Sequence, residues 1–192
     1  MVSLNKGEKI SLDKTVPGLV NVKVGLGWSP STRPGVEFDL DASAFLLASN
    51  GKIPDDAHFI FYNNKVSPDA SVTGADDDRT GGSSTGDDEE ITINLSMVSS
   101  QIERIVIVVT IHDATARSQS FGDVKDSYVR VLNMADGSEI VRYDLTGDYS
   151  KADAVIFGEL GRVPGGWDFT AIGDGSNAGL SGLCKQFGVN VS

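Results

Sequence analysis

The sequence is poor in the side chains that form disulfides and bind transition metals. Its 192 residues include one cysteine, Cys184, and two histidines. A single cysteine excludes an intramolecular disulfide and fits a reducing compartment. Zinc, copper and iron sites need clustered His or Cys ligands, so these metals are not expected.

Long apolar runs and clustered positive charge are also missing. No segment approaches the length of a membrane span, and the first residues, MVSLNKGEKISL, lack the charged and then apolar pattern of a signal peptide. We therefore expect a cytoplasmic protein without a transmembrane segment. With 16 basic residues against 27 acidic ones, the chain is a poor partner for nucleic acid, because phosphate binding needs clustered Lys and Arg.

The sequence does contain a hydrophobic period of two. β-Branched and aromatic residues alternate with polar ones in short runs bounded by Gly, Pro, Asn and Asp, which is typical of strands. The run IVIVVTI is apolar on both faces, as in a central buried strand. We predict ten strands, at about 8–12, 20–28, 36–48, 57–63, 90–95, 103–112, 127–134, 139–145, 153–162 and 167–173. The first of them carries Lys and Glu, which favours an edge position.

One helix is expected near the C-terminal end. Leu180, Leu183, Cys184 and Phe187 follow a helical spacing, and Gly188 is a typical C-terminal stop. Cys184 lies on the apolar stripe of this helix and is expected in the core. Locally paired strands with one terminal helix predict an all-β fold. It is an antiparallel β-sandwich of two sheets in a single domain spanning 1–192.

The negative charge is concentrated in one segment, GADDDRTGGSSTGDDEEI. Between positions 76 and 90 it carries seven carboxylates and one cation, Arg79, which accounts for −6 of the net charge of −11. Two like charges about 4 Å apart repel by about 1 kcal/mol in water and about 4 kcal/mol near a protein surface. Several such pairs would approach the net stability of a domain. The segment is therefore either a solvated acidic loop or a cation site that is disordered without metal and ordered with it.

A second acidic pair favours the cation site. In the motif FDLD, a strand would turn Asp39 and Asp41 to one face and Phe38 and Leu40 to the other. Carboxylates, hydroxyls and glycine carbonyls are the ligands that calcium prefers, with about six to eight oxygens in adaptable geometry. The residues themselves thus indicate calcium, held between this strand and the acidic segment.

His112 and Asp113 close the buried strand predicted at 103–112. A neighbouring His and Asp can suggest catalysis. A His at a strand end is more often a hydrogen-bonded structural residue, and we interpret His112 in that way. Asp113 is a candidate outer ligand of the metal.

Eight motifs, in order along the chain, resemble the TerD family of tellurite-resistance and stress-response proteins. They are VGLGW at 24–28, FDLDASAFLL at 38–47, FIFYNN at 59–64, the acidic segment at 74–91, VVTIHDA at 108–114, QSFG at 119–122, RYDLT at 142–146 and FGELGR at 157–162. The resemblance implies a calcium-binding β-sandwich of the bacterial cytoplasm that is not an enzyme. It also implies complexes with other tellurite-resistance and stress-response proteins, some of them peripherally associated with the inner membrane.

The resemblance also carries calcium ligation onto particular residues, with two ions expected and one ion as the alternative. The candidate metal ligands are Asp39, Asp41, Asp76, Asp77, Asp78, Gly81, Asp87, Asp88 and Glu89. Where the family has a further Glu and Asp in the middle of the acidic segment, this chain has the neutral run 82–85. That departure puts the number of ions and their affinity in question.

Two other functions stay open at this point. A calcium-dependent lipid- or ligand-binding module would leave coordination positions on the metal for a phosphate or a sugar hydroxyl. A metal-dependent hydrolase would need His112 as general base and Arg79 or Arg117 to hold a transition-state anion. No catalytic residue is assigned, and we expect no enzymatic activity.

Overall fold

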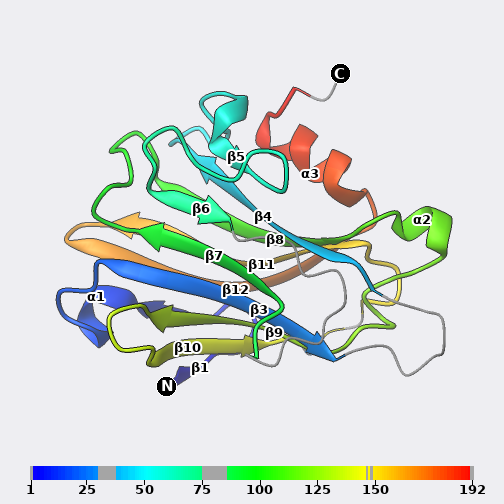
Figure 1. The fold of residues 1–192 in the computed structure, drawn as a ribbon, viewed down its shortest axis with the longest axis horizontal. Helices are drawn as coiled ribbons and strands as arrows, with labels where there is room; N and C mark the ends of the chain where they lie inside the picture. The colour runs from blue at the N-terminus through cyan, green and yellow to red at the C-terminus, as the bar shows by residue number, and fades with distance from the viewer. Residues whose placement is uncertain (1, 30–37, 75–85, 146, 148, 191–192) are drawn as a thin grey trace.

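The computed structural model describes residues 2–29, 38–74, 86–145, 147 and 149–190. Within them the chain forms two six-stranded sheets that pack face to face (Figure 1). Sheet A consists, in spatial order, of β1 (Val2–Ser3), β10 (Glu139–Asp144), β9 (Lys125–Asn133), β3 (Asn21–Ser29), β7 (Glu89–Asn94) and β6 (Val72–Gly74). Sheet B consists of β2 (Lys9–Ser11), β12 (Gly166–Ser176), β11 (Ala154–Val163), β8 (Arg104–Ile111), β4 (Leu40–Leu47) and β5 (Phe59–Ile60). The predicted all-β sandwich is confirmed.

The strand β8 (Arg104–Ile111) is apolar from Ile105 to Val109 because both of its faces are covered. Ile105, Ile107 and Val109 face the core between the two sheets. Val106 and Val108 face a second apolar cluster on the other side of sheet B. Since β8 lies between β11 and β4, the prediction of a central buried strand is confirmed, and β2 lies at an edge as expected.

Helix α3 (Gly179–Phe187) covers the second apolar cluster. Its residues Leu183, Cys184 and Phe187 are buried there, and the helix ends at Gly188, which has a φ of +88°. The predicted terminal helix and the buried position of Cys184 are confirmed, and burial raises the pKa of the Cys184 thiol. The other helices are short: α1 (Leu12–Thr15), η1 (Asp56–His58) and α2 (Ala114–Arg117). None of the helices in the described ranges is long and apolar enough to cross a membrane.

The strand predictions fail at short and irregular elements. The strands β1 and β6 have two and three residues, which is too few to show a period, and β1 pairs with β10 in parallel. The strand predicted at 57–63 is reduced to β5, because the Asp55 side chain accepts a hydrogen bond from the Ala57 N–H and begins η1. The strand predicted at 36–48 begins at Leu40, and its first two residues lie outside the described ranges.

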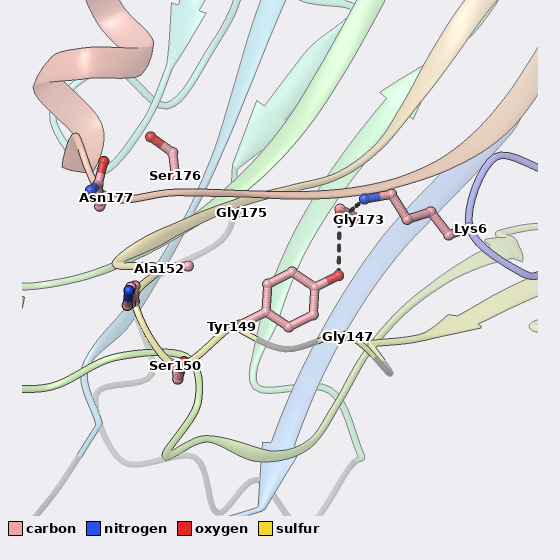
Figure 2. A pocket seen from close by; sticks show the side chains of 10 residues that line it. Lys6, Gly147, Tyr149, Ser150, Ala152, Gly173, Gly175, Ser176 and Asn177 are labelled. Atoms are coloured by element: carbon pink, nitrogen blue, oxygen red, sulfur yellow. Dashed lines mark hydrogen bonds between the residues drawn. The ribbon is translucent and has the colours of Figure 1, made fainter.

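An irregularity near the end of the β11–β12 pair positions the segment before β11. The register shifts between Ile156 and Gly158 on β11, and Gly173 on β12 has a φ of +64°. The Tyr149 hydroxyl donates a hydrogen bond to the Gly173 carbonyl at 2.8 Å (Figure 2). The segment before β11 is therefore held against the end of β12.

Asp69 connects the loop before β6 to the turn after β7. Its Oδ1 accepts hydrogen bonds from the Ser67 hydroxyl at 2.7 Å and the Ser71 hydroxyl at 2.6 Å, and its Oδ2 accepts one from the Ser99 N–H at 2.8 Å. Partial burial raises the pKa of this carboxyl, but the hydrogen bonds outweigh burial and lower it to about 2. The ionised carboxylate thus stabilises the fold.

We expect Asp69→Ala to lower the free energy of unfolding by about 1–3 kcal/mol at pH 7, because the Ser99 N–H and two hydroxyls lose their acceptor. The folded-state pKa is depressed, so the contribution is complete above the unfolded pKa of about 3.9 and disappears as the pH falls towards about 2. Urea denaturation between pH 7 and pH 3 measures both effects. Asp174→Ala, which removes an exposed carboxylate, is the control. A difference between wild type and Asp69→Ala that stays constant in acid would contradict this role.

Candidate metal centre

Asp39 and Asp41 lie at the start of β4 with the alternation that the FDLD motif predicts. Phe38 and Leu40 are buried in the core between the sheets, whereas both aspartates are partly exposed. An extended chain places successive side chains on opposite faces, which explains this division. The Asp39 carbonyl accepts a hydrogen bond from the His112 N–H at 2.8 Å, so the start of β4 is fixed beside the end of β8.

Basic side chains flank both aspartates. The Arg117 Nη2 atom on α2 is 3.8 Å from Asp39 Oδ2, and His112 Nδ1 is 3.8 Å from Asp41 Oδ2. His112 Nε2 is also 3.4 Å from Asp113 Oδ2, so the imidazole bridges two carboxylates. Long, partly exposed pairs of this kind contribute about 1 kcal/mol or less. A metal ion could therefore replace these ion pairs with only a small loss of stability.

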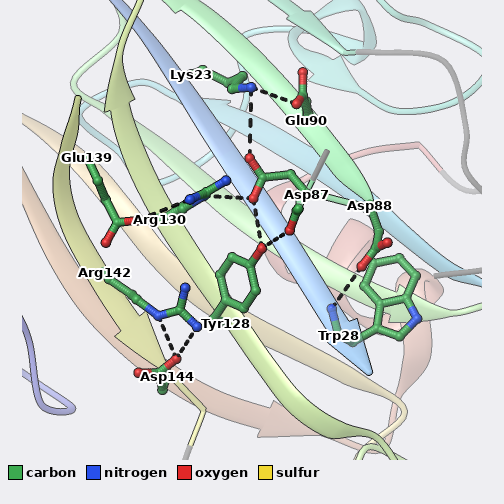
Figure 3. Close-up of polar contacts among 11 residues, drawn as sticks. Lys23, Trp28, Asp87, Asp88, Glu90, Tyr128, Arg130, Glu139, Arg142 and Asp144 are labelled. Atoms are coloured by element: carbon green, nitrogen blue, oxygen red, sulfur yellow. Dashed lines mark hydrogen bonds and ion pairs between the residues drawn. The ribbon is translucent and has the colours of Figure 1, made fainter. Parts of the chain in front are cut away.

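The Asp87 carboxylate is buried in an ion-pair network on sheet A (Figure 3). Asp87 precedes β7, yet its side chain crosses β3 to reach β9. Its Oδ1 accepts hydrogen bonds from Arg130 Nε at 2.8 Å and the Tyr128 hydroxyl at 2.9 Å, and Lys23 Nζ is 3.8 Å from its Oδ2. The side chain is 1% exposed, and a charge this buried is stable only when it is paired.

Two glycines of β3 make room for this network. A Cβ atom at Gly25 would overlap the Asp87 carboxylate, 2.5 Å from its Cγ, and one at Gly27 would lie 2.5 Å from the Tyr128 hydroxyl. Burial, followed by the negative charge of Asp87, raises the pKa of Tyr128 to about 12. The hydrogen bond from Arg130 to Asp87 raises the pKa of the Arg130 guanidinium. At neutral pH Tyr128 is therefore a neutral donor and Arg130 a cation.

Sequence reasoning missed these partners. Within the segment 76–90 it found only Arg79 to balance the carboxylates, whereas the structure supplies Arg130 and Lys23 from other strands. Lys23 Nζ also pairs with Glu90 at 2.7 Å. The available signal was in β3, where the period of two places both glycines of VGLGW on the same face as the lysine.

Asp88 and Glu89 face other partners. The Trp28 N–H donates a hydrogen bond to Asp88 Oδ2 at 2.9 Å. Glu89 is 7% exposed and lines a pocket of about 20 Å³ together with Asp41 and Lys65. A volume of this size holds about one water molecule. The pocket is thus lined by acidic residues of β4 and β7, and hence of both sheets.

The remaining predicted ligands are not part of the described structure. Asp76, Asp77, Asp78 and Gly81 all lie outside the described residues. In the part of the chain that the structure covers, no three His, Cys, Asp or Glu side chains are grouped to hold a metal ion. Of the predicted ligands that are described, Asp41 and Glu89 meet at one pocket, and Asp87 is engaged with Arg130.

Known proteins resemble this chain over nearly its whole length. The TerD domain family model matches residues 1–187. The chain is 52% identical over 191 residues to tellurium resistance protein TerD of Serratia marcescens, covering 100% of this chain and 99% of that protein. It is 46% identical to general stress protein 16U of Bacillus subtilis, covering 99% and 98% respectively. The crystal structure of a homologue of telluride resistance protein (TerD) from Streptomyces coelicolor matches with a TM-score of 0.68 and 25% identity, covering 86% of this chain and 95% of that one. The chain therefore belongs to the TerD family of tellurium-resistance and stress-response proteins.

Proposed function

We propose that this protein binds calcium at the end of the sandwich where β4 and β7 begin, and that the bound metal orders a surface for partner proteins. The proposed role is not enzymatic. The partners are other tellurite-resistance and stress-response proteins of the cytoplasm, some of them in complexes at the inner membrane. The names of the relatives, which refer to tellurium resistance and general stress, support the stress-response part of the proposal.

The observation that carries the proposal is the meeting of Asp41 and Glu89 at one small pocket. They come from strands of different sheets, so the two acidic residues have a rigid frame. Calcium takes about six to eight oxygens at about 2.3–2.6 Å, and carboxylates supply oxygens of this kind. Asp39, Asp88 and the predicted ligands at 76–81 would supply further oxygens. We propose two ions, with a single ion as the alternative.

Lys65 lines the same pocket and brings positive charge to it. Its ammonium group and a calcium ion would compete for the same carboxylates, because either cation lowers their electrostatic repulsion. Removing this lysine is therefore expected to strengthen calcium binding.

Calcium is expected to raise the melting temperature of the calcium-free protein. At a concentration 100-fold above the Kd, binding to the folded state alone adds about 2.7 kcal/mol, or roughly 5–10 °C for a chain of this size. Asp39→Asn combined with Asp41→Asn should abolish the shift. Asp136→Asn, in the turn between β9 and β10, should show the same rise in melting temperature as the wild type. Lys65→Gln should show that rise at a lower calcium concentration.

Thermal denaturation in buffer cleared of calcium by a chelating resin, with calcium added stepwise, measures these shifts. Asp136→Asn is a matched control because it removes one carboxylate charge beside the start of β3, at the other end of that strand from Glu89. An unchanged melting temperature in millimolar calcium, or equal shifts in the double variant and in Asp136→Asn, would overturn the proposal.

A further inference from the structure

Another pocket, of about 620 Å³, lies at the end of β12 (Figure 2). It is formed by the segment between β1 and β2, the segment before β11, the last residues of β12 and the start of the connection to α3. Across sheet B, Asp41 pairs with Thr110, Thr110 with Ala154 and Ala154 with Ser176. Three strand spacings, about 14 Å, therefore separate this pocket from the candidate metal centre.

The charged side chains that line this pocket are cationic. Lys6 and Lys151 line it, with no Asp or Glu of the described residues among the lining, although the whole chain has a net charge of −11. Lys6 Nζ is 2.7 Å from Asp174 Oδ1 at the rim, where the two side chains are 59% and 63% exposed. Such exposed pairs are weak, so Lys6 can turn to a bound anion.

Neutral donors accompany the two lysines. Ser176 and Asn177 line the pocket at the end opposite Lys6 (Figure 2). The Ser176 Oγ accepts a hydrogen bond from the Ala178 N–H at 3.1 Å, which leaves its hydroxyl hydrogen to donate elsewhere. Ammonium, hydroxyl and amide donors around one space suit a group with several acceptor oxygens and negative charge.

The floor of the pocket is preformed around the Gly173 carbonyl. Lys6 Nζ and the Tyr149 hydroxyl both donate to the Gly173 carbonyl, at 2.9 and 2.8 Å. A Cβ atom at Gly173 would overlap the Tyr143 hydroxyl, so the floor requires glycine there. Burial raises the pKa of Tyr143 to about 12 and also raises that of Tyr149. Both phenols are thus neutral at physiological pH and do not repel an anion.

We propose that this pocket binds a small organic phosphate, with Lys151 pairing with the phosphate group, Ser176 and Asn177 donating hydrogen bonds, and Lys6 adding positive charge from the other end of the pocket. Sites for small molecules have volumes of about 300–1,000 Å³, and the pocket lies within that range. Inorganic phosphate alone would leave most of the space to water, whereas a sugar phosphate would fill more of it. The proposal goes beyond calcium binding and does not depend on it.

Isothermal titration of the full chain with ribose 5-phosphate, inorganic phosphate and ribose, in calcium-free buffer of low salt, tests the proposal. We expect ribose 5-phosphate to bind, inorganic phosphate to bind more weakly and ribose not to bind. Lys151→Gln should weaken ribose 5-phosphate binding at least about tenfold, because a charge-assisted contact is lost. Asp174→Asn should strengthen binding, since it releases Lys6. Lys14→Gln on α1, which removes an exposed lysine outside the pocket lining, should leave it unchanged.

Amide resonances provide a second readout in the same samples. Shifts caused by ribose 5-phosphate should centre on residues 149–152 and 173–177. The proposal is wrong if neither anion binds at millimolar concentration, or if Lys151→Gln and Lys14→Gln bind equally well. Equal affinity for inorganic phosphate and ribose 5-phosphate would also contradict it, because the organic part would then make no contact.

Discussion

Asp87→Ala is expected to lower the free energy of unfolding of the calcium-free protein by about 3 kcal/mol, equivalent to roughly 6–12 °C in melting temperature. The variant leaves the Arg130 guanidinium, whose side chain is 21% exposed, without its shortest ion pair. Breaking a buried pair by removing one partner costs about 3–5 kcal/mol. We expect the lower end of this range because Arg130 Nη1 keeps Glu139 Oε2 at 3.2 Å.

The sign of this effect separates two roles of Asp87. If the residue served only as a metal ligand in a repulsive acidic segment, its removal in calcium-free buffer would relieve repulsion and stabilise the protein. If it anchors the segment to β9, its removal destabilises the protein without any metal. Urea denaturation in calcium-free buffer decides between these outcomes, and an unchanged or increased stability would refute the anchoring role.

Two further variants refine the measurement. Glu90→Ala removes a carboxylate that also pairs with Lys23, at 2.7 Å, but is 33% exposed, so a loss below about 1 kcal/mol is expected. Arg130→Met removes the cation and keeps much of the side-chain volume. Combined with Asp87→Ala it should cost much less than the sum of the single losses, because each single variant leaves the other charge without its shortest ion pair.

This network changes the account of the acidic segment. From the sequence, the segment is predicted to be disordered without metal, because Arg79 is the only cation within it. At its end, however, Asp87 and Glu90 pair with cations of sheet A, and Asp88 accepts the Trp28 N–H. These contacts offset part of the negative charge at the end of the segment. Metal-dependent ordering of the segment 76–90 stays a prediction, and the prediction that Asp87 ligates calcium now has a protein cation as its competitor.

The features predicted correctly from the sequence are those that depend only on the order of residues within a short stretch of the chain. The alternation of Phe38, Asp39, Leu40 and Asp41 depends only on the geometry of an extended chain. The apolar run of β8 and the helical spacing of α3 report burial in the same local way. Such patterns determine the faces of strands, and therefore the sandwich.

The features that were missed depend on which strands are neighbours. Asp87 meets Arg130 because β3 lies between β7 and β9, and no local period specifies that order. Strand β6 was missed because Val72–Gly74 has too few residues to alternate. The shortened β5 follows from a side-chain hydrogen bond of Asp55, which competes locally with extension of the strand.

The second large effect on stability is expected at Gly25. A side chain added there would enter the space that the Asp87 carboxylate occupies. An added methyl group would lie 2.5 Å from the Asp87 Cγ atom, and the carboxylate cannot move aside without leaving Arg130. We expect Gly25→Ala to lower the free energy of unfolding by about 2–3 kcal/mol, as for other overpacked sites. Gly161→Ala on β11 is the matched control. It is also a strand glycine, but an added Cβ has open space there, so a neutral or slightly stabilising change is expected.

The double variant Gly25→Ala/Asp87→Ala makes the test specific. With the carboxylate removed, the new methyl group enters vacated space, and the cost of Gly25→Ala should fall below about 0.5 kcal/mol. The coupling between the two sites should then be at least about 1.5 kcal/mol, which is within the range for residues in direct contact. Urea denaturation of the four proteins in calcium-free buffer gives this value.

The size of the coupling decides why β3 carries a glycine at this position. If Gly25→Ala costs as much without Asp87 as with it, strain in β3 itself is the cause, and the glycine does not serve to seat the carboxylate. A large coupling would instead give the first glycine of VGLGW a definite structural role. Its missing side chain would be what lets a carboxylate from beyond β7 cross β3 and pair with Arg130 on β9.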